Sequence, residues 1–257
     1  MIYLIKLFLV GLFTLPLSSL IVLAAPFGCM GKPVDAVARL WAWMILRIGG
    51  IRLRVRGLDR LDPGRHYIFI ANHQSYLDIP VLVQSLPQFQ LRWIAKKEVV
   101  YIPFLGWALW AGGHILVDRS DRASGMASFR KAKERIARGV SVVIFPEGTR
   151  SSGGQVRPFK RGGFLLAAQT KTPIVPITIN GSWAVLPRED WRLKSGEIEV
   201  VVDEPIPIEK YDGKEIDLLV KRVRDMIEAH CGGPVRPNAE NSERAQAPAA
   251  ANSRGLD

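Results

Sequence analysis

The stretch FIANHQSYLDIPVL, from Phe69 to Leu82, decides how the chain is interpreted. An apolar run ends at Asn72, and His73 and Asp78 follow with four residues between them before apolar residues resume. On one continuous helix, residues five apart point in different directions. The two side chains can therefore meet only if His73 lies in a turn and Asp78 in the first turn of a helix. Pro80 supports this placement, because proline is tolerated in a first helical turn.

A histidine and an aspartate placed in this way can act together in catalysis. Asp78 can accept a hydrogen bond from a ring N–H of His73 and fix its tautomer, which leaves the other ring nitrogen free to take a proton from a hydroxyl. These are two members of a catalytic triad. The chain has no G-x-S-x-G motif and no cysteine near His73, so the expected nucleophile is the substrate's own hydroxyl. The alternative is an N-capping aspartate beside an ordinary loop histidine.

Short buried-strand patterns alternate with helix-like segments along the rest of the chain. Strands are predicted at Ile51–Gly57, Tyr67–Asn72, Arg92–Lys96, His114–Asp118, Val142–Pro146, Pro173–Ile179 and Glu197–Ile206. Helices are predicted at Ile79–Ser85, Phe104–Ala111, Ala123–Arg138, Gly162–Thr170 and Glu215–Ala229. Strands separated by helices predict an α/β fold, with a mostly parallel sheet flanked by helices.

Length and composition predict three regions. The 257 residues suit one domain with an added anchor. We expect N-terminal membrane-anchoring helices over residues 1–50, a main α/β domain over 51–231, and a disordered tail over 232–257, because the tail is rich in Pro, Ala, Asn and charged residues.

The net charge of +11 predicts an anionic partner. We expect no nucleic acid, because the chain has no zinc-finger spacing, no RNA-recognition aromatic motif and no long basic helix. An anionic lipid surface is therefore the expected partner. The two cysteines, Cys29 and Cys231, predict neither a disulfide framework nor a metal site.

The N-terminal segment is apolar enough to enter a bilayer. Residues Leu7 to Phe27 carry no charge, so a spanning helix, a helical hairpin lying in one leaflet and a cleaved signal peptide all fit. The apolar run is longer than the apolar core of a typical signal peptide, which disfavours a cleaved signal peptide. Val34 to Ile48 carries the Trp and Arg residues typical of the headgroup region, although a core helix is its alternative. Arginines at 47, 52, 54 and 56 predict a membrane-associated protein whose catalytic domain lies on the cytoplasmic face.

A second cluster, VVIFPEGTRS from Val142 to Ser151, ends another strand where parallel sheets collect ligand sites. Arg150 can bind a phosphate through paired N–H groups, and Gly148 permits close backbone approach. Glu147 is expected to accept from a substrate hydroxyl or to hold Arg150 in place.

Two further basic segments are candidates for anion binding. Lys160 and Arg161, in PFKRGGF, precede a predicted helix start, which favours an anion, although a solvated loop is the alternative. Asp118 and Arg119 end another strand, where a structural salt bridge is the alternative.

Four blocks in this order resemble the 1-acyl-glycerol-3-phosphate acyltransferases of the glycerolipid acyltransferase superfamily. They are NHQSYLD, GGHILVDR, FPEGTR and IVPITI, and they cover roughly Leu53 to Glu204. Ile115 to Val117 departs from the pattern, since many relatives carry an aromatic residue there. The resemblance implies a glycerol-3-phosphate acyltransferase-like fold. It also implies that His73 is the general base, that Asp78 orients it, and that the glycerol phosphate is bound by Arg119, Glu147, Gly148, Thr149 and Arg150, to which we add Lys160.

The implied reaction moves an acyl group from a thioester to the sn-2 hydroxyl of 1-acyl-glycerol 3-phosphate, giving phosphatidate. The donor would be acyl-CoA or acyl carrier protein, and no cofactor or metal is expected. We expect backbone N–H groups near the His73 turn to hold the oxyanion. Two alternatives stay open at this point: another lyso-lipid acceptor such as lyso-ornithine lipid, and a non-catalytic protein that binds anionic lipid. The sequence leaves the donor, the acyl-chain length and the oligomeric state open.

Overall fold

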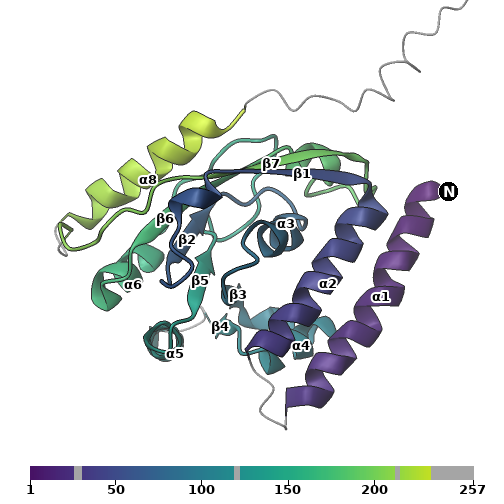
Figure 1. Cartoon of the computed structure of the whole chain (residues 1–257), viewed down its shortest axis with the longest axis horizontal. Coiled ribbons are helices and arrows are strands. Elements are labelled where there is room, and N and C mark those ends of the chain that lie inside the picture. Colours follow the sequence, from purple (N-terminus) through teal and green to yellow (C-terminus); the bar gives the residue numbers. More distant parts are fainter. Residues whose placement is uncertain (26–30, 119–121, 212–214, 233–257) are drawn as a thin grey trace, which may run out of the picture.

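A seven-stranded sheet forms the centre of the molecule, in the strand order β1-β7-β6-β2-β5-β3-β4 (Figure 1). The computed structural model describes residues 1–25, 31–118, 122–211 and 215–232. Neighbouring strands are parallel except β6 and β7, so the predicted mostly parallel α/β sheet is confirmed, with one antiparallel pairing. The strands are β1 (Ile51–Arg56), β2 (Ile68–Ala71), β3 (Leu91–Lys96), β4 (Ile115–Val117), β5 (Ser141–Ile144), β6 (Ile174–Asn180) and β7 (Gly196–Val202).

Helices cover both faces of the sheet, as the alternating sequence pattern predicts. They are α1 (Ile2–Ala24), α2 (Lys32–Gly49), α3 (Asp78–Ser85), α4 (Leu105–Ala111), α5 (Arg122–Ala137), α6 (Gly162–Thr170), α7 (Ser182–Val185) and α8 (Ile216–His230). The short helix α7 and two 3₁₀ turns, η2 (Leu58–Arg60) and η3 (Lys97–Tyr101), were not predicted, because such short elements have no hydrophobic period of their own.

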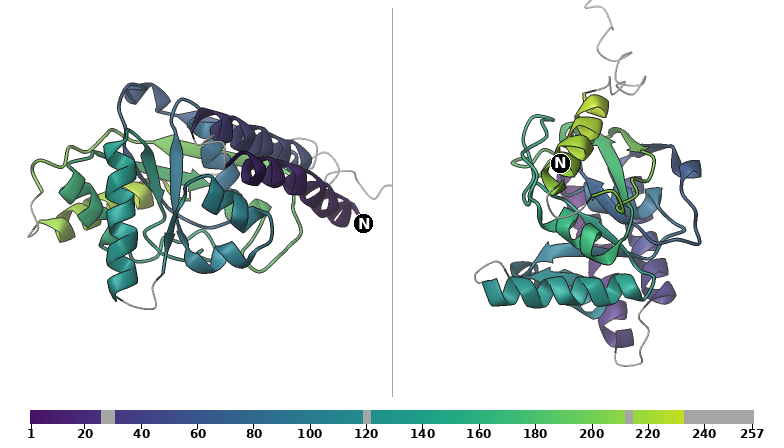
Figure 2. Two further views of the ribbon diagram at one scale, coloured as in Figure 1. Left: turned by 90° about the horizontal axis from the view of Figure 1, so that it is seen from below. Right: turned by 90° about the vertical axis from the view of Figure 1, so that its left-hand side faces the viewer.

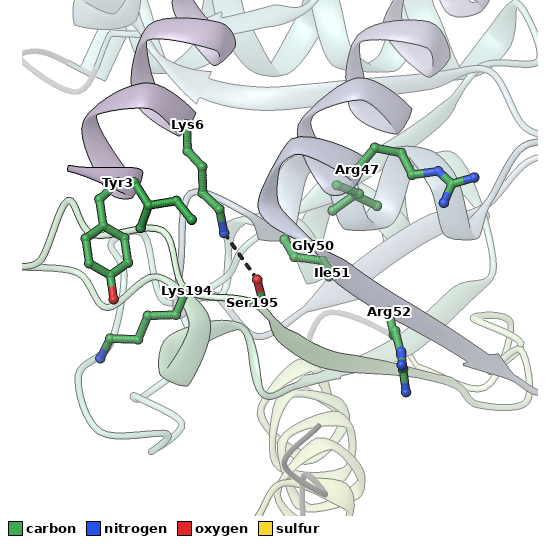
Figure 3. Close-up of a pocket in the computed structure, with 10 residues that line it drawn as sticks. Tyr3, Lys6, Arg47, Gly50, Ile51, Arg52, Lys194 and Ser195 are labelled. Atoms are coloured by element: carbon green, nitrogen blue, oxygen red, sulfur yellow. Dashed lines mark hydrogen bonds between the residues drawn. The ribbon is translucent and has the colours of Figure 1, made fainter. Parts of the chain in front are cut away.

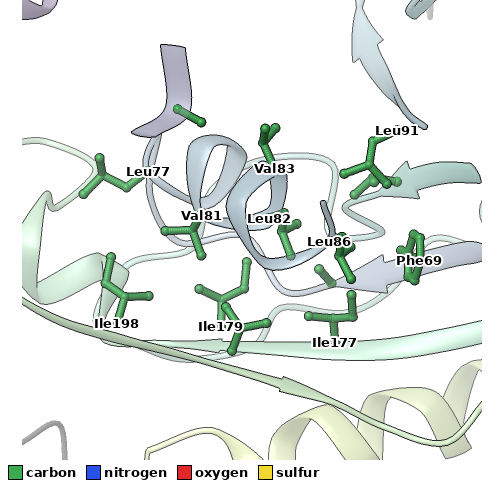
Figure 4. Close-up of a cluster of buried hydrophobic side chains, with 14 of the residues drawn as sticks. Phe69, Leu77, Val81, Leu82, Val83, Leu86, Leu91, Ile177, Ile179 and Ile198 are labelled. Carbon is green, nitrogen blue, oxygen red and sulfur yellow. The ribbon is translucent and has the colours of Figure 1, made fainter. Parts of the chain in front are cut away.

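Strand β2 is buried on both sides, and its side chains alternate between two hydrophobic clusters. Phe69 and Ala71 belong to the cluster under α2 and α3, whereas Ile68 and Ile70 belong to the cluster with α5, α6 and α8. Figure 4 shows the first cluster, in which α3 directs Val81 and other apolar side chains toward β6 and β7. This packing fixes the position of α3, the helix that begins at Asp78.

Asn72 joins the end of β2 to β6. Its Nδ2 donates to the carbonyl of Ile179 at 2.9 Å, and its Oδ1 accepts from the N–H of Ile179 at 2.7 Å. The side chain thereby continues the sheet pairing for one residue beyond β2. The turn that contains His73 therefore starts from a fixed point.

The two N-terminal helices lie side by side along one flank of the sheet domain (Figures 1 and 2). Among the described residues, α1 alone is long and apolar enough to cross a membrane by length and composition, and Ser18 is its one buried residue. One face of α2 belongs to the hydrophobic core through Ala42, Ile45 and Leu46, while Leu40 and Trp43 are exposed. The core-helix alternative for this segment is therefore correct for one face, and the other face keeps an aromatic residue at the surface.

A buried ion pair ties α2 to β3. Arg92 Nη1 lies 2.6 Å from Asp35 Oδ1, and their side chains are only 4% and 11% exposed. Removing one partner of a buried pair leaves the other charge uncompensated in a low dielectric.

We predict that Asp35→Ala lowers the free energy of unfolding by about 3–5 kcal/mol, the usual result of breaking a buried pair. The matched control is Asp225→Ala, which removes an exposed pair with Lys221 on α8 and is expected to cost under about 1 kcal/mol. Urea unfolding in detergent, followed by tryptophan fluorescence, measures both. Equal losses in the two variants would contradict the prediction.

Candidate active site

The turn after β2 places His73 against Asp78, as the sequence predicts. His73 Nδ1 lies 2.8 Å from Asp78 Oδ2. The same oxygen accepts the backbone N–H groups of Gln74 and Ser75 at 2.7 and 2.8 Å. Asp78 is fully buried at the first position of α3, where the helix dipole favours a negative charge. Because Oδ2 acts as an acceptor toward both backbone groups, the proton between the two side chains lies on Nδ1, and Nε2 is the free basic nitrogen.

Aromatic rings hold the imidazole in place. The ring of His73 stacks on Phe145, with centroids 4.0 Å apart, and Phe145 stacks in turn on Trp93 at 5.9 Å. The His73 side chain is 16% exposed. Within the part of the chain that the structure describes, Nε2 has no hydrogen-bond partner. It is therefore available to a substrate hydroxyl.

Glu147 supports this turn from the turn that follows the neighbouring strand β5. Its Oε1 accepts the backbone N–H of His73 at 2.9 Å, and its Oε2 accepts the N–H of Arg157 at 3.2 Å. The expectation that Glu147 accepts from a substrate hydroxyl or holds Arg150 is thus not met, because both oxygens serve backbone groups and the residue is buried. Burial raises the pKa of Glu147 to about 7, although the two N–H groups favour the ionised form.

The backbone N–H groups expected to hold an oxyanion are already used inside the protein. Those of Gln74 and Ser75 donate to Asp78, that of His73 donates to Glu147, and that of Leu77 donates to the hydroxyl of Ser75. The oxyanion expectation is therefore wrong for these four groups, because the same N–H groups are needed to build the turn.

Arg150 lies beside the His73 turn. Its guanidinium carbon is 3.6 Å above the ring of Tyr76, and Arg150 and Arg188 each donate to the other's carbonyl, at 3.4 and 3.0 Å. Tyr76 is strongly exposed, between His73 and Asp78 in the sequence. A stacked, half-exposed guanidinium with free N–H groups suits a phosphate.

The other predicted binding residues differ in position. Gly148 has a φ of 73° and closes the turn by donating its N–H to Phe145 at 3.1 Å, which explains the glycine. Thr149 follows it and is half-buried. Lys160 is exposed and lines a cavity of about 340 Å³ with Phe145 and Gly148, on the α5 and α6 side of the sheet.

Arg119 lies outside the described residues. Asp118, its neighbour, forms an ion pair with Lys97 at 3.0 Å, as the salt-bridge alternative for this segment expected.

An apolar cavity of about 220 Å³ opens beside Tyr76. It is enclosed by α1, α2, α3 and α4, and its walls include Leu17, Ile79, Trp93 and Leu105. Because Trp93 also belongs to the stack with Phe145 and His73, the cavity extends to the aromatic stack that holds the imidazole.

Some of these residues could not be identified from the sequence. Tyr76, Phe145 and Arg188 make their contacts with residues far away in the sequence. Tyr76 and Phe145 lie within the two motifs around His73 and Glu147, whereas Arg188 lies in no predicted motif. No group of three or more His, Cys, Asp or Glu residues that could hold a metal occurs among the residues described here.

We predict that the stability difference between the wild type and Glu147→Gln depends on pH. A carboxyl group whose folded pKa is raised from 4.5 to about 7 binds its proton more tightly in the folded state, so its contribution is complete below pH 4.5 and is lost as pH rises through 7. The wild type should therefore lose about 3 kcal/mol relative to Glu147→Gln over this window and change little above it. Urea midpoints at several pH values measure this, and a difference that stays constant or increases with pH would contradict it.

Comparisons with known proteins agree with the site. The family model described as Acyltransferase matches residues 52–180. Human 1-acyl-sn-glycerol-3-phosphate acyltransferase alpha is 35% identical over 209 residues, which cover 80% of this chain and 74% of the relative. The chloroplastic 1-acyl-sn-glycerol-3-phosphate acyltransferase BAT2 of Brassica napus is 35% identical over 193 residues, covering 74% and 54%.

A crystal structure shares the fold. The 1-acyl-sn-glycerophosphate acyltransferase PlsC from Thermotoga maritima superposes with a TM-score of 0.75 at 23% identity, over 97% of each chain. Together with the sequence relatives, the family match identifies the group to which this chain belongs. The chain is a member of the acyltransferase family, among the 1-acyl-sn-glycerol-3-phosphate acyltransferases.

Proposed function

We propose that this protein transfers an acyl group from a thioester to the sn-2 hydroxyl of 1-acyl-sn-glycerol 3-phosphate, giving phosphatidate. The observation that carries the proposal is the 2.8 Å contact between His73 Nδ1 and a buried carboxylate, which leaves Nε2 open to a substrate. Relatives that bear this activity in their names support it.

In the proposed reaction, Nε2 of His73 takes the proton of the hydroxyl as its oxygen attacks the thioester carbonyl. The imidazolium that forms is stabilised by Asp78. The tetrahedral intermediate then collapses, the carbon–sulfur bond breaks, and the departing sulfur takes the proton from Nε2. The enzyme returns to its starting state, and the only co-substrate is the thioester, on CoA or on acyl carrier protein.

The apolar cavity is the proposed place for an acyl chain. It begins at Tyr76, next to the catalytic pair, and its walls are mainly hydrocarbon and aromatic side chains. Burial of each chain methylene contributes about 0.8 kcal/mol. Arg150, stacked on Tyr76 at the cavity entrance, would then hold the phosphate of the acceptor, with Lys160, Gly148 and Thr149 as further candidates from the neighbouring turn.

We propose that α1 holds the protein on a membrane without crossing it. The helix packs against α2 and α4, and Lys6 ties its first turns to the carbonyl groups of Gly49 and Leu193 at 2.9 and 3.3 Å. A spanning helix would leave the domain, whereas this one lies along it. Its exposed leucines and Phe8 would enter one leaflet. The arginines of β1 favour the cytoplasmic leaflet, because its anionic lipids attract them.

We predict that His73→Ala and Asp78→Asn each reduce kcat by roughly 10³–10⁴-fold, because one removes the base and the other its orienting charge. The control is His66→Ala, which removes a histidine just before β2, at the opposite edge of the sheet. Thiol release from acyl-CoA or acyl carrier protein, with lysophosphatidate in detergent micelles, measures the rates. Turnover within tenfold of the wild type in purified, folded His73→Ala would end the proposal.

We predict that Arg150→Ala raises the KM for lysophosphatidate roughly 10- to 100-fold with a smaller change in kcat, since a hydrogen bond to a charged group contributes about 1.5–3 kcal/mol. The variant should also lose its preference for lysophosphatidate over 1-acylglycerol, which lacks the phosphate. Arg222→Ala, on α8 and hydrogen-bonded to Tyr211, is the matched control. An unchanged preference in Arg150→Ala would show that the phosphate is held elsewhere.

A further inference from the structure

A basic cavity lies where the start of α1 meets the junction of α2 and β1 (Figure 3). Its volume is about 670 Å³, and four cationic side chains line it: Lys6, Arg47, Arg52 and Lys194. None of the described residues that line it is an Asp or a Glu. The proposed acyl-transfer reaction makes no use of this cavity.

Arg52 differs from the two other arginines of β1, which form ion pairs with β7. Alternate positions of β1 place Arg52, Arg54 and Arg56 on one side of the strand. Arg54 pairs with Glu197 of β7 at 3.1 Å, and Arg56 pairs with Glu199 at 3.0 Å. Within the ranges that the structure describes, Arg52 forms no ion pair, although its register partner is Glu197.

An acidic group that interacts with Lys194 is already paired. Asp190, which Lys194 influences electrostatically, receives the guanidinium of Arg192 at 2.9 Å. Positive charge therefore remains in excess on both sides of the cavity. Figure 3 shows Tyr3 and Lys194 on one side, and Arg47 and Arg52 on the other.

Lys6 has a different part in this cavity from the other three cations. Its ammonium donates to Gly49, Leu193 and Ser195 at 2.9, 3.3 and 3.2 Å, so its three N–H groups are used. Figure 3 shows the bond to Ser195. It fixes α1 against the domain and adds charge to the wall. The donors left for a ligand belong to the two arginines and Lys194.

The same cavity has apolar walls. Ile2, Leu46 and Ile51 line it, and it lies at the N-terminal start of α1, which carries exposed apolar side chains along its length. A ligand that fits both features carries a negative charge and a hydrocarbon chain. We propose that the cavity binds the phosphate of an anionic membrane phospholipid, with its acyl chains along α1.

This site is separate from the His73 site but lies at the same edge of the sheet. Strands β7 and β6 separate β1 from β2, and three strand spacings amount to about 14 Å. Because β1 is parallel to β7, which is antiparallel to β6, β1 begins at the edge where β2 ends. A phospholipid held here keeps the catalytic edge of the sheet against the membrane surface.

The test is binding of the full chain to phosphatidylcholine vesicles with and without phosphatidylglycerol, an anionic lipid that is neither acceptor nor product of the proposed reaction. The variant Arg52→Gln/Lys194→Gln should bind the anionic vesicles about 30-fold more weakly, since each cation near a membrane surface contributes about 1 kcal/mol. The control Arg65→Gln/Lys133→Gln loses the same charge elsewhere on the domain and should change binding less than about threefold. Turnover of a short-chain acceptor in detergent should be normal in both double variants, which shows that they fold.

Three results would overturn the proposal. The first is unchanged binding of anionic vesicles by Arg52→Gln/Lys194→Gln, and the second is an equal loss in the control, which would show only an effect of net charge. The third comes from thermal unfolding of the wild type with short-chain phosphatidylglycerol, inorganic phosphate or CoA. Stabilisation by phosphate or CoA that equals that by the lipid, and disappears in Arg52→Gln/Lys194→Gln, would assign the cavity to a soluble phosphate.

Discussion

The buried carboxylate of Asp78 is the constraint on which the site depends. One oxygen accepts from His73 and from the backbone of Gln74 and Ser75, so a single atom closes the turn and orients the imidazole. Burial strengthens these bonds, because no water competes for the carboxylate. The position of that carboxylate follows from α3, whose apolar face packs on β6 and β7.

Two neighbouring parallel strands bring the remaining parts together. β2 ends in the His73 turn, and β5, paired with it, ends in the turn that carries Phe145, Glu147 and Arg150. Phe145 supports the ring of His73, Glu147 holds its backbone, and Arg150 lies over Tyr76. The base, its support and the proposed anion-binding group therefore belong to one sheet edge, beside the apolar cavity enclosed by α1, α2, α3 and α4.

The sequence was sufficient where the determining interactions are local. The strands and the longer helices followed from hydrophobic period, and the contact between His73 and Asp78 followed from a five-residue spacing with Pro80 behind it. Contacts between residues far apart in the chain could not be predicted from the sequence. The role of Glu147 was misassigned because its partners, His73 and Arg157, are brought to it only by folding. Likewise, nothing in the sequence places Asn72 against Ile179, 107 positions away, or turns β7 antiparallel to β6.

The most direct test of this account is the tautomer of His73 with a neutral ring, read from ¹⁵N and ¹H chemical shifts of the imidazole in detergent micelles. The account predicts a proton on Nδ1, shifted downfield by its bond to Asp78, and an unprotonated Nε2. In Asp78→Asn that downfield signal should disappear. A neutral ring protonated on Nε2 in the wild type would contradict the account, because that nitrogen could not then act as the base.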